Sequence, residues 1–244
     1  MQGTPNDVLS RMERKLARLS ALSTHDRDFI RALPHRVSAE AAGTYLVQEG
    51  EKPTECCVLV DGYACRHKAT SNGGRQIVSF HLPGDLLDLQ HSQLPTADHN
   101  VQTVTQATIA WIPFDALRAL GRASTAINDA LWRDALIDAS IFREWVLNVG
   151  RRDAKQRVAH MLCEFAARRE AAGLGVPEHF QLPMTQEDIA DATGLTPVHV
   201  NRMLRALAEE GVIARQTARE IQIIDWPRMQ RVADFHPAYL HQAA

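Results

Sequence analysis

The feature that most constrains the fold of this chain is a pair of short predicted helices joined by a tight turn. Thr185 stands three residues before Asp188, the spacing of a capping box, in which a hydroxyl and a carboxylate satisfy the first backbone N–H groups of a helix. Gly194 suits the left-handed conformation that ends such a helix sharply. Thr196 then caps a second helix, and Pro197 takes its first position, where a missing N–H costs nothing.

The second predicted helix has two different faces. Its inward stripe consists of Val200, Met203, Leu204 and Leu207. Its outward face carries the residues predicted to contact DNA, which are Thr196, Pro197, Val198, His199, Asn201, Arg202 and Arg205. A helix-turn-helix needs this division, because one face fixes the helix to its scaffold while the other enters the major groove. Thr185 and Gln186, at the start of the first helix, are further candidates. A helical hairpin with no nucleic-acid role is the alternative interpretation.

A short β-hairpin is predicted directly after these helices. Glu210-Gly211 forms a turn, and residues 212–215 and 220–223 contain apolar residues at strand spacing, which predicts a two-stranded wing. Arg215 and Arg219 lie near its tip and are candidates for phosphate contacts, although exposed arginines are often merely solvated.

The net charge of the C-terminal part argues mildly against DNA binding. From Asp153 onward, ten Lys and Arg stand against twelve Asp and Glu, whereas nucleic-acid modules usually carry a clustered positive surface. Any basic footprint is therefore expected on one face only. The sequence has no apolar run long enough to span a membrane and no signal pattern at its start, so we expect a cytoplasmic protein without a membrane segment.

The N-terminal half changes from a helical to a strand-like pattern. Residues 6–33 predict two short helices, and residues 43–113 contain short β runs separated by Gly and Pro. The clearest runs are residues 45–47, 57–60, 77–80, 101–105 and 108–112. Short strands at such regular spacing predict an antiparallel barrel or roll.

A long helix is predicted between these two regions, over residues 124–149. One apolar stripe comprises Ile127, Leu131, Ala135, Phe142, Trp145 and Val149, with Leu136, Ile137 and Ile141 beside it. We expect so broad an apolar surface to pack on its own domain and on a partner helix in a dimer, with packing inside the monomer as the alternative. Residues 150–153 predict a hinge, and Asp153 predicts the N-cap of a helix over 154–171.

These elements predict an α+β chain of three parts. The first, residues 1–123, is a sensor domain, an antiparallel β-roll of the jelly-roll type with N-terminal helices. The second, residues 124–152, is the dimerisation helix with its hinge. The third, residues 153–244, is a winged helix-turn-helix DNA-binding domain.

This order of elements resembles the Crp/Fnr family of bacterial transcription regulators over nearly the whole chain. The residues that carry the likeness are Gly50-Glu51, Asp61-Gly62 and Pro83-Gly84-Asp85 in the roll, residues 185–190 and 194–204 in the helix-turn-helix, and Tyr239-Leu240-His241. The resemblance implies a homodimer that binds a pseudo-palindromic promoter site on double-stranded DNA and contacts RNA polymerase.

The roll departs from the pattern of family members that bind cyclic nucleotides. Those members carry an Arg that pairs with the cyclic phosphate, whereas residues 84–100 of this chain contain no Arg or Lys. A buried phosphodiester without a cation is poorly compensated. We therefore predict that this protein does not bind cyclic AMP with useful affinity, and its small effector stays unidentified. The residues of the roll proposed for an effector pocket are Asp88, Gln90, His91, Asp98 and His99.

The cysteines and histidines bear on sensing by cofactors. The oxygen-sensing branch of the family holds an iron–sulfur centre with N-terminal cysteines, but the first 55 residues here contain none. The cysteines, at positions 56, 57, 65 and 163, lack metal-binding spacing and fit small buried hydrophobes, with a thiol redox sensor as the alternative. No metal or cofactor is predicted, although His81, His91 and His99 leave haem open as a minor alternative.

The recognition helix also departs from the best-known relatives. Val198 stands where they have a Glu that accepts from cytosine, so contact with a thymine methyl is a possible replacement. Arg202 matches the family's guanine-contacting Arg. Thr196 and His199 suit phosphates, and Asn201 suits either phosphates or bases.

Two other classes of function are alternatives to a DNA-binding regulator. A ligand-binding roll whose C-terminal helices serve only protein contacts is one alternative, and the cap at Thr196-Pro197 and the wing argue against it. An enzyme is the other. The sequence contains no nucleophile elbow, phosphate-binding loop, dinucleotide fingerprint or zinc-protease motif, so we expect no enzymatic activity.

Overall fold

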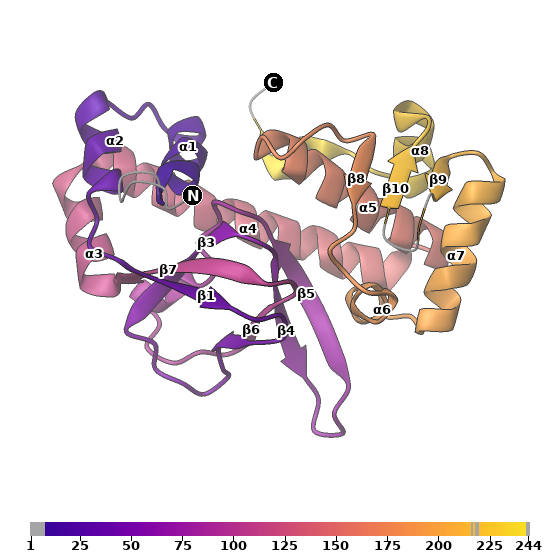
Figure 1. Ribbon diagram of the computed structural model, residues 1–244, viewed down its shortest axis with the longest axis horizontal. Helices are drawn as coiled ribbons and strands as arrows, with labels where there is room; N and C mark the ends of the chain where they lie inside the picture. Colours follow the sequence, from indigo (N-terminus) through magenta and orange to yellow (C-terminus); the bar gives the residue numbers. More distant parts are fainter. Residues whose placement is uncertain (1–7, 216, 218–219, 243–244) are drawn as a thin grey trace. The chain divides into compact units, whose positions relative to one another are not determined.

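The computed structural model describes residues 8–215, 217 and 220–242, and it has the predicted α+β architecture. In chain order the elements are α1 (Ser10–Leu19), α2 (Thr24–Arg31), β1 (Arg36–Glu40), β2 (Tyr45–Val47), β3 (Glu55–Asp61), β4 (Ala64–Ala69), β5 (Arg75–His81), β6 (Asn100–Thr103), β7 (Ala107–Pro113), α3 (Phe114–Ala123), α4 (Thr125–Arg151), α5 (Ala154–Ala171), β8 (His179–Gln181), α6 (Gln186–Thr193), α7 (Pro197–Glu209), β9 (Ile213–Arg215), β10 (Glu220–Ile223) and α8 (Trp226–Ala233), with 3₁₀ turns at Leu89–Ser92 and Pro237–Leu240 (Figure 1).

The chain forms two compact units. The first comprises Met1–His67 and Phe80–Ala139, and the second comprises Lys68–Ser79 and Ser140–Ala244. None of the helices among the described residues is long and apolar enough to cross a membrane.

The strands of the roll form two antiparallel sheets, with strand orders β1-β7-β3 and β2-β6-β4-β5. Successive residues of β3 bury their side chains on opposite faces, as the two-residue period of a strand requires. Cys56 and Val58 join an apolar core shared with α1, α2, α3 and α4, whereas Cys57 and Leu59 join the core inside the roll. β3 is therefore buried on both faces.

Two strands of the roll were missed because their sequences lack a strand-like apolar pattern. β1 (Arg36–Glu40) has no fully buried side chain, as suits a strand that pairs only with β7 in its sheet. β4 (Ala64–Ala69) contains Arg66, His67 and Lys68 in succession, which hides its alternation. α3 was not predicted either, although its Phe114, Leu117 and Leu120 are buried at helical spacing.

The second unit contains the helices that follow α4. α5 contributes ten consecutive buried residues, Val158–Ala167, and packs against α6, α7 and α8. The predicted two-stranded wing is wrong in one respect. β8 pairs with β10, so the sheet has three strands in the order β8-β10-β9. The three-residue β8 is too short for an alternating pattern to mark it.

The turn between α4 and α5 begins later than the sequence predicted. Gly150 lies inside α4, which continues to Arg151, so only residues 152 and 153 separate the helices. Arg152 is buried there, and its Nη2 lies 2.7 Å from Oε1 of Glu144 and 3.2 Å from Oδ2 of Asp234. Asp153 caps α5 as predicted, accepting from the backbone N–H of Gln156 at 2.9 Å. Side-chain contacts therefore hold this turn in the second unit.

Candidate nucleic-acid interface

α6 and α7 form the helix-turn-helix. Thr185 Oγ1 accepts from the backbone N–H of Asp188 at 3.1 Å, and Asp188 Oδ2 accepts from the backbone N–H of Thr185 at 2.9 Å, which completes the predicted capping box. Gly194 has φ of +65°, the left-handed conformation that ends α6. Thr196 Oγ1 then accepts from the backbone N–H of His199 at 3.3 Å, and Pro197 begins α7.

Gly194 gives a direct test of this turn. A Cβ at this position would lie no closer than 3.7 Å to another atom, so the cost of a side chain comes from the left-handed backbone alone. We expect Gly194→Ala to lower the free energy of unfolding by about 1 kcal/mol. Gly121→Ala, at a helical position whose added Cβ has its closest contact at 3.4 Å, is the matched control and should leave stability unchanged or raise it. The test is urea unfolding of both variants. Equal free energies of unfolding for Gly194→Ala and Gly121→Ala would contradict the left-handed conformation of this turn.

α7 is fixed by one face and exposes the other. Val200, Leu204 and Leu207 are buried as predicted, whereas Met203, placed in the same stripe, is only half-buried. On the outer face Thr196, Pro197, Val198, Arg202 and Arg205 are exposed, and His199 and Asn201 are half-buried. The side chain of Val198 is 82% exposed, so packing within this chain does not explain an aliphatic residue at this position.

The wing contributes Arg215 beside α7. β9 pairs with β10 through Ile221 opposite Arg215, which places this arginine at the end of the paired region. Arg215 is half-buried, and its Nη1 donates to Oδ1 of Asn201 at 3.2 Å. Arg219, the other predicted phosphate contact, lies outside the described residues.

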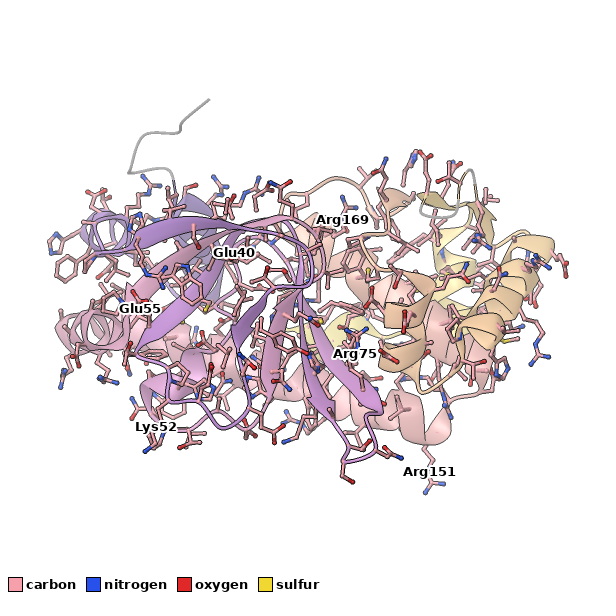
Figure 2. All side chains as sticks on the ribbon, turned by 60° about the horizontal axis from the view of Figure 1, so that its bottom comes forward. Glu40, Lys52, Glu55, Arg75, Arg151 and Arg169 are labelled. Carbon is pink, nitrogen blue, oxygen red and sulfur yellow. The ribbon has the colours of Figure 1, made fainter. Side chains whose placement is uncertain are left out.

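The acidic residues of the helix-turn-helix are partly neutralised by contacts that sequence analysis missed. Arg75, which is labelled in Figure 2, has its Nη2 2.8 Å from Oδ1 of Asp188 and its Nε 2.6 Å from Oδ2 of Asp191, so two of the three carboxylates of α6 are paired. Glu210, at the end of α7, pairs with Lys155 at 2.7 Å. A local basic footprint is therefore compatible with a negative net charge. No local pattern reveals Arg75, because it precedes its partners by more than 110 residues.

The residues proposed for an effector pocket are only partly brought together in the roll. The rings of His91 and His99 stack with centroids 5.3 Å apart, and Gln90 Nε2 lies 3.2 Å from Nε2 of His99. Asp98 is exposed and contacts Nδ1 of His99 at 2.7 Å. Asp88 is fully buried, where its Oδ1 accepts from the backbone N–H of Cys57 at 2.9 Å, which is a structural contact.

His81 is buried, with its Nδ1 3.7 Å from Oδ2 of Asp85. Among the described residues, no group of three or more His, Cys, Asp or Glu has the arrangement of a metal site.

Arg66 is a half-buried cation of the roll that the sequence did not indicate. Its Nη1 lies 2.5 Å from Oδ2 of Asp138, and its Nη2 donates to the carbonyl oxygen of Leu87 at 2.6 Å. It was missed because it lies on β4, outside residues 84–100, the stretch in which the resemblance implied that a phosphate-binding Arg would stand. Because Asp138 neutralises Arg66, the guanidinium of Arg66 is already engaged in an ion pair within the first unit.

Burial lowers the pKa of His99 to about 4, with the positive charge of Arg66 acting in the same direction and the contact with Asp98 opposing it. Between pH 6.5 and about 4 the unfolded chain therefore binds a proton at His99 that the folded chain does not. We expect stability to fall as the pH is lowered through this window, and His99→Gln to reduce that fall. His236→Gln, on a ring that is 87% exposed, is the control in urea unfolding measured at each pH, and an unchanged pH dependence in His99→Gln would contradict the assignment.

The four cysteines are buried free thiols. Burial raises the pKa of Cys56 and Cys57 well above 9.0, with the charge of Asp88 adding to the shift, and burial also raises the pKa of Cys163. Because the thiolate is the reactive form, these surroundings favour the interpretation as small core residues over a redox sensor.

The apolar residues that α4 exposes differ from those that the sequence predicted to lie in one stripe. Ile127, Leu131 and Trp145 are buried, whereas Leu136 and Phe142 are exposed together with Trp132, Val146 and Leu147. Exposed positions recur at Trp132, Leu136, Ala139, Arg143, Val146 and Gly150. These steps alternate between four and three residues, which is the heptad spacing of a helix that packs against a second helix.

Comparisons with known proteins identify one family match in the roll and one in the helix-turn-helix part of the chain. The family description "Cyclic nucleotide-binding domain" matches residues 40–124, and "Crp-like helix-turn-helix domain" matches residues 156–232. The transcriptional activator protein FnrL of Cereibacter sphaeroides is 29% identical over 77% of this chain and 76% of its own. The nitrogen fixation regulation protein FixK of Rhizobium meliloti is 28% identical over 78% of this chain and 84% of its own. The structure of FixK2 from Bradyrhizobium japonicum superposes with a TM-score of 0.75 at 26% identity, covering 82% of this chain and 98% of that one.

Proposed function

This chain belongs to the Crp/Fnr family of DNA-binding transcription regulators, and we propose that it binds a pseudo-palindromic promoter site as a homodimer. The observation that carries the proposal is the outer face of α7, where Val198, Arg202 and Arg205 are exposed on a capped helix held to α5 by its other face. Such a helix can enter the major groove with its N-terminus first.

Most residues of this face have a proposed contact. Arg202 donates to the O6 and N7 atoms of a guanine, the commonest specific contact of an arginine in the major groove. Val198 packs on a thymine methyl group, because it cannot accept a hydrogen bond. Thr196, Pro197 and His199 lie at the N-terminus of α7, where backbone N–H groups and the helix dipole favour a phosphate. Thr185 and Gln186, at the start of α6, and Arg205 are proposed to contact the backbone.

The other parts of the proposal follow the predicted division of the chain. Residues 1–123 sense an effector, residues 124–152 pair the two protomers through the exposed stripe of α4, and residues 153–244 bind DNA. The relative FnrL is named a transcriptional activator, which supports RNA polymerase as a further partner. We propose that the protein acts on chromosomal DNA in the cytoplasm and has no enzymatic activity.

Selection of bound fragments from a random DNA pool tests the proposed function. We expect the full-length protein to enrich one motif whose two halves are related by symmetry and whose centres lie about one helical turn, 10 base pairs, apart. Parallel selections with candidate effectors, and with and without air, identify the signal that changes enrichment. Recovery of unenriched DNA under all these conditions would contradict sequence-specific binding.

Cyclic AMP is expected not to be the effector. The roll stretch that holds the phosphate in cyclic-nucleotide-binding relatives has no cation here, and Arg66 of β4 is neutralised by Asp138. A phosphodiester buried without a free cation loses its hydration without compensation. Isothermal titration calorimetry with cyclic AMP should show no saturable binding in the micromolar range. Micromolar binding would contradict this prediction and leave DNA binding unaffected.

A further inference from the structure

The hydrogen bond between the wing and the recognition helix bears on which bases the protein prefers. It joins Arg215, the last residue of β9, to Asn201, which lies on the first turns of α7. The Nη1 to Oδ1 distance is 3.2 Å, and both residues are half-buried. Asn201 precedes Arg202 and lies one helical turn after Val198, so its amide borders the exposed face of α7.

The chemistry of the two groups fixes the orientation of the amide. A guanidinium has only N–H donors, whereas an asparagine amide has an oxygen that accepts and an –NH₂ group that donates. The amide must therefore turn its oxygen toward Arg215, and its –NH₂ group points away from the wing. In this orientation Asn201 is a donor toward any partner other than Arg215.

An amide that can only donate prefers different bases from an amide whose oxygen is also free to accept. A free asparagine can bind adenine in a bidentate manner, accepting from N6 and donating to N7. In the major groove guanine O6 and thymine O4 accept, whereas the N6 and N4 amino groups of adenine and cytosine donate. With its oxygen turned to Arg215, Asn201 loses the contact to adenine N6 and keeps only donor contacts, which the N7 atoms of purines and the keto oxygens of guanine and thymine accept. Adenine therefore loses its advantage over a keto base, and cytosine offers no acceptor to the –NH₂ group.

We propose that Arg215 is a positioning residue that orients the amide of Asn201, so that at one base of each half-site Asn201 disfavours cytosine and does not favour adenine over guanine or thymine. This inference rests on the proposed function, because it requires α7 to lie in the major groove. It replaces the expectation that Arg215 serves only as a phosphate contact.

The test is motif selection from a random DNA pool with the full-length protein and its variants. At the position that Asn201 contacts, the wild type should disfavour cytosine and show no preference for adenine over a keto base. Arg215→Ala frees the amide, so adenine should rise about fivefold relative to the keto base at that position, the effect of about one net hydrogen bond. Asn201→Ala should abolish the preference there, and the double variant should match Asn201→Ala because both changes act on one contact.

Asn201→Asp gives an independent test that does not depend on how well Arg215→Ala folds. Aspartate keeps an acceptor for Arg215 but presents a second oxygen where the –NH₂ group was. The preference should move to adenine or cytosine, whose amino groups donate, by about fivefold. Arg228→Ala, which removes an exposed cation of α8 instead, is the control and should leave the wild-type motif unchanged.

The outcomes separate this inference from the proposed function. If Arg215→Ala weakens binding to all sequences equally and reduces the salt dependence by about one phosphate contact, Arg215 contacts the backbone and the inference is wrong. An unchanged base preference in Asn201→Asp would also overturn it. If the wild type enriches no motif, the proposed function fails instead.

Discussion

Leu136→Glu is expected to weaken binding to the full promoter site by at least about 100-fold, because linking two half-site contacts in one dimer multiplies their affinity by that order. Leu136 is 60% exposed and lies in the middle of the apolar stripe of α4. A carboxylate at this position would be buried against the partner helix without a cation, which is strongly unfavourable. The variant should therefore elute as a monomer and bind a half-site no more weakly than the wild-type protomer does.

The measurement is analytical ultracentrifugation together with a gel-shift titration on full and half sites. Gln106→Glu is the control, because it adds the same charge at an exposed position between β6 and β7. Circular dichroism and thermal unfolding verify that both variants are folded. A Leu136→Glu protein that remains dimeric with wild-type affinity would show that this stripe is not the interface.

The sequence predicted the helix-turn-helix well because its determinants are local. The capping box of Thr185 and Asp188, the left-handed Gly194 and the cap at Thr196 each involve residues within a few positions of one another. Local hydrogen bonds and backbone preferences decide such features, and a single sequence displays them directly. The same reasoning explains why Asp153 was correctly placed as the N-cap of α5.

The sequence was less informative where distant segments decide the structure. β4 contains three consecutive polar residues, and its strand conformation depends on pairing with β6. Arg66, Arg75 and Arg215 obtain their partners through the fold, so their roles do not follow from spacing. On α4 the stripe predicted to be continuous divides into buried Leu131 and Trp145 and exposed Phe142, because a wide apolar surface does not itself indicate which of its residues are buried.

Arg202→Ala is the substitution on α7 with the largest expected effect on sequence recognition. Arg202 is exposed on the outer face, and its guanidinium is proposed to donate twice to a guanine. Removing such a bidentate contact costs about 1–3 kcal/mol, which is about 5- to 150-fold in affinity, at the site that contains the guanine. At a site in which this guanine is replaced, wild type and variant should bind almost equally.

Arg202→Lys separates the geometry of the contact from its charge. Lysine keeps the positive charge but lacks the rigid pair of donors, so a guanine contact should be weakened although electrostatic attraction to DNA is kept. If Arg202 contacts only phosphates, lysine should instead restore affinity, and the salt dependence should fall by about one contact in Arg202→Ala alone. Titrations of both variants on the guanine site and on the substituted site, at several salt concentrations, distinguish these cases. Since Val198 cannot accept a hydrogen bond from a base, the guanine proposed for Arg202 is expected to account for most of the specificity of this face of α7.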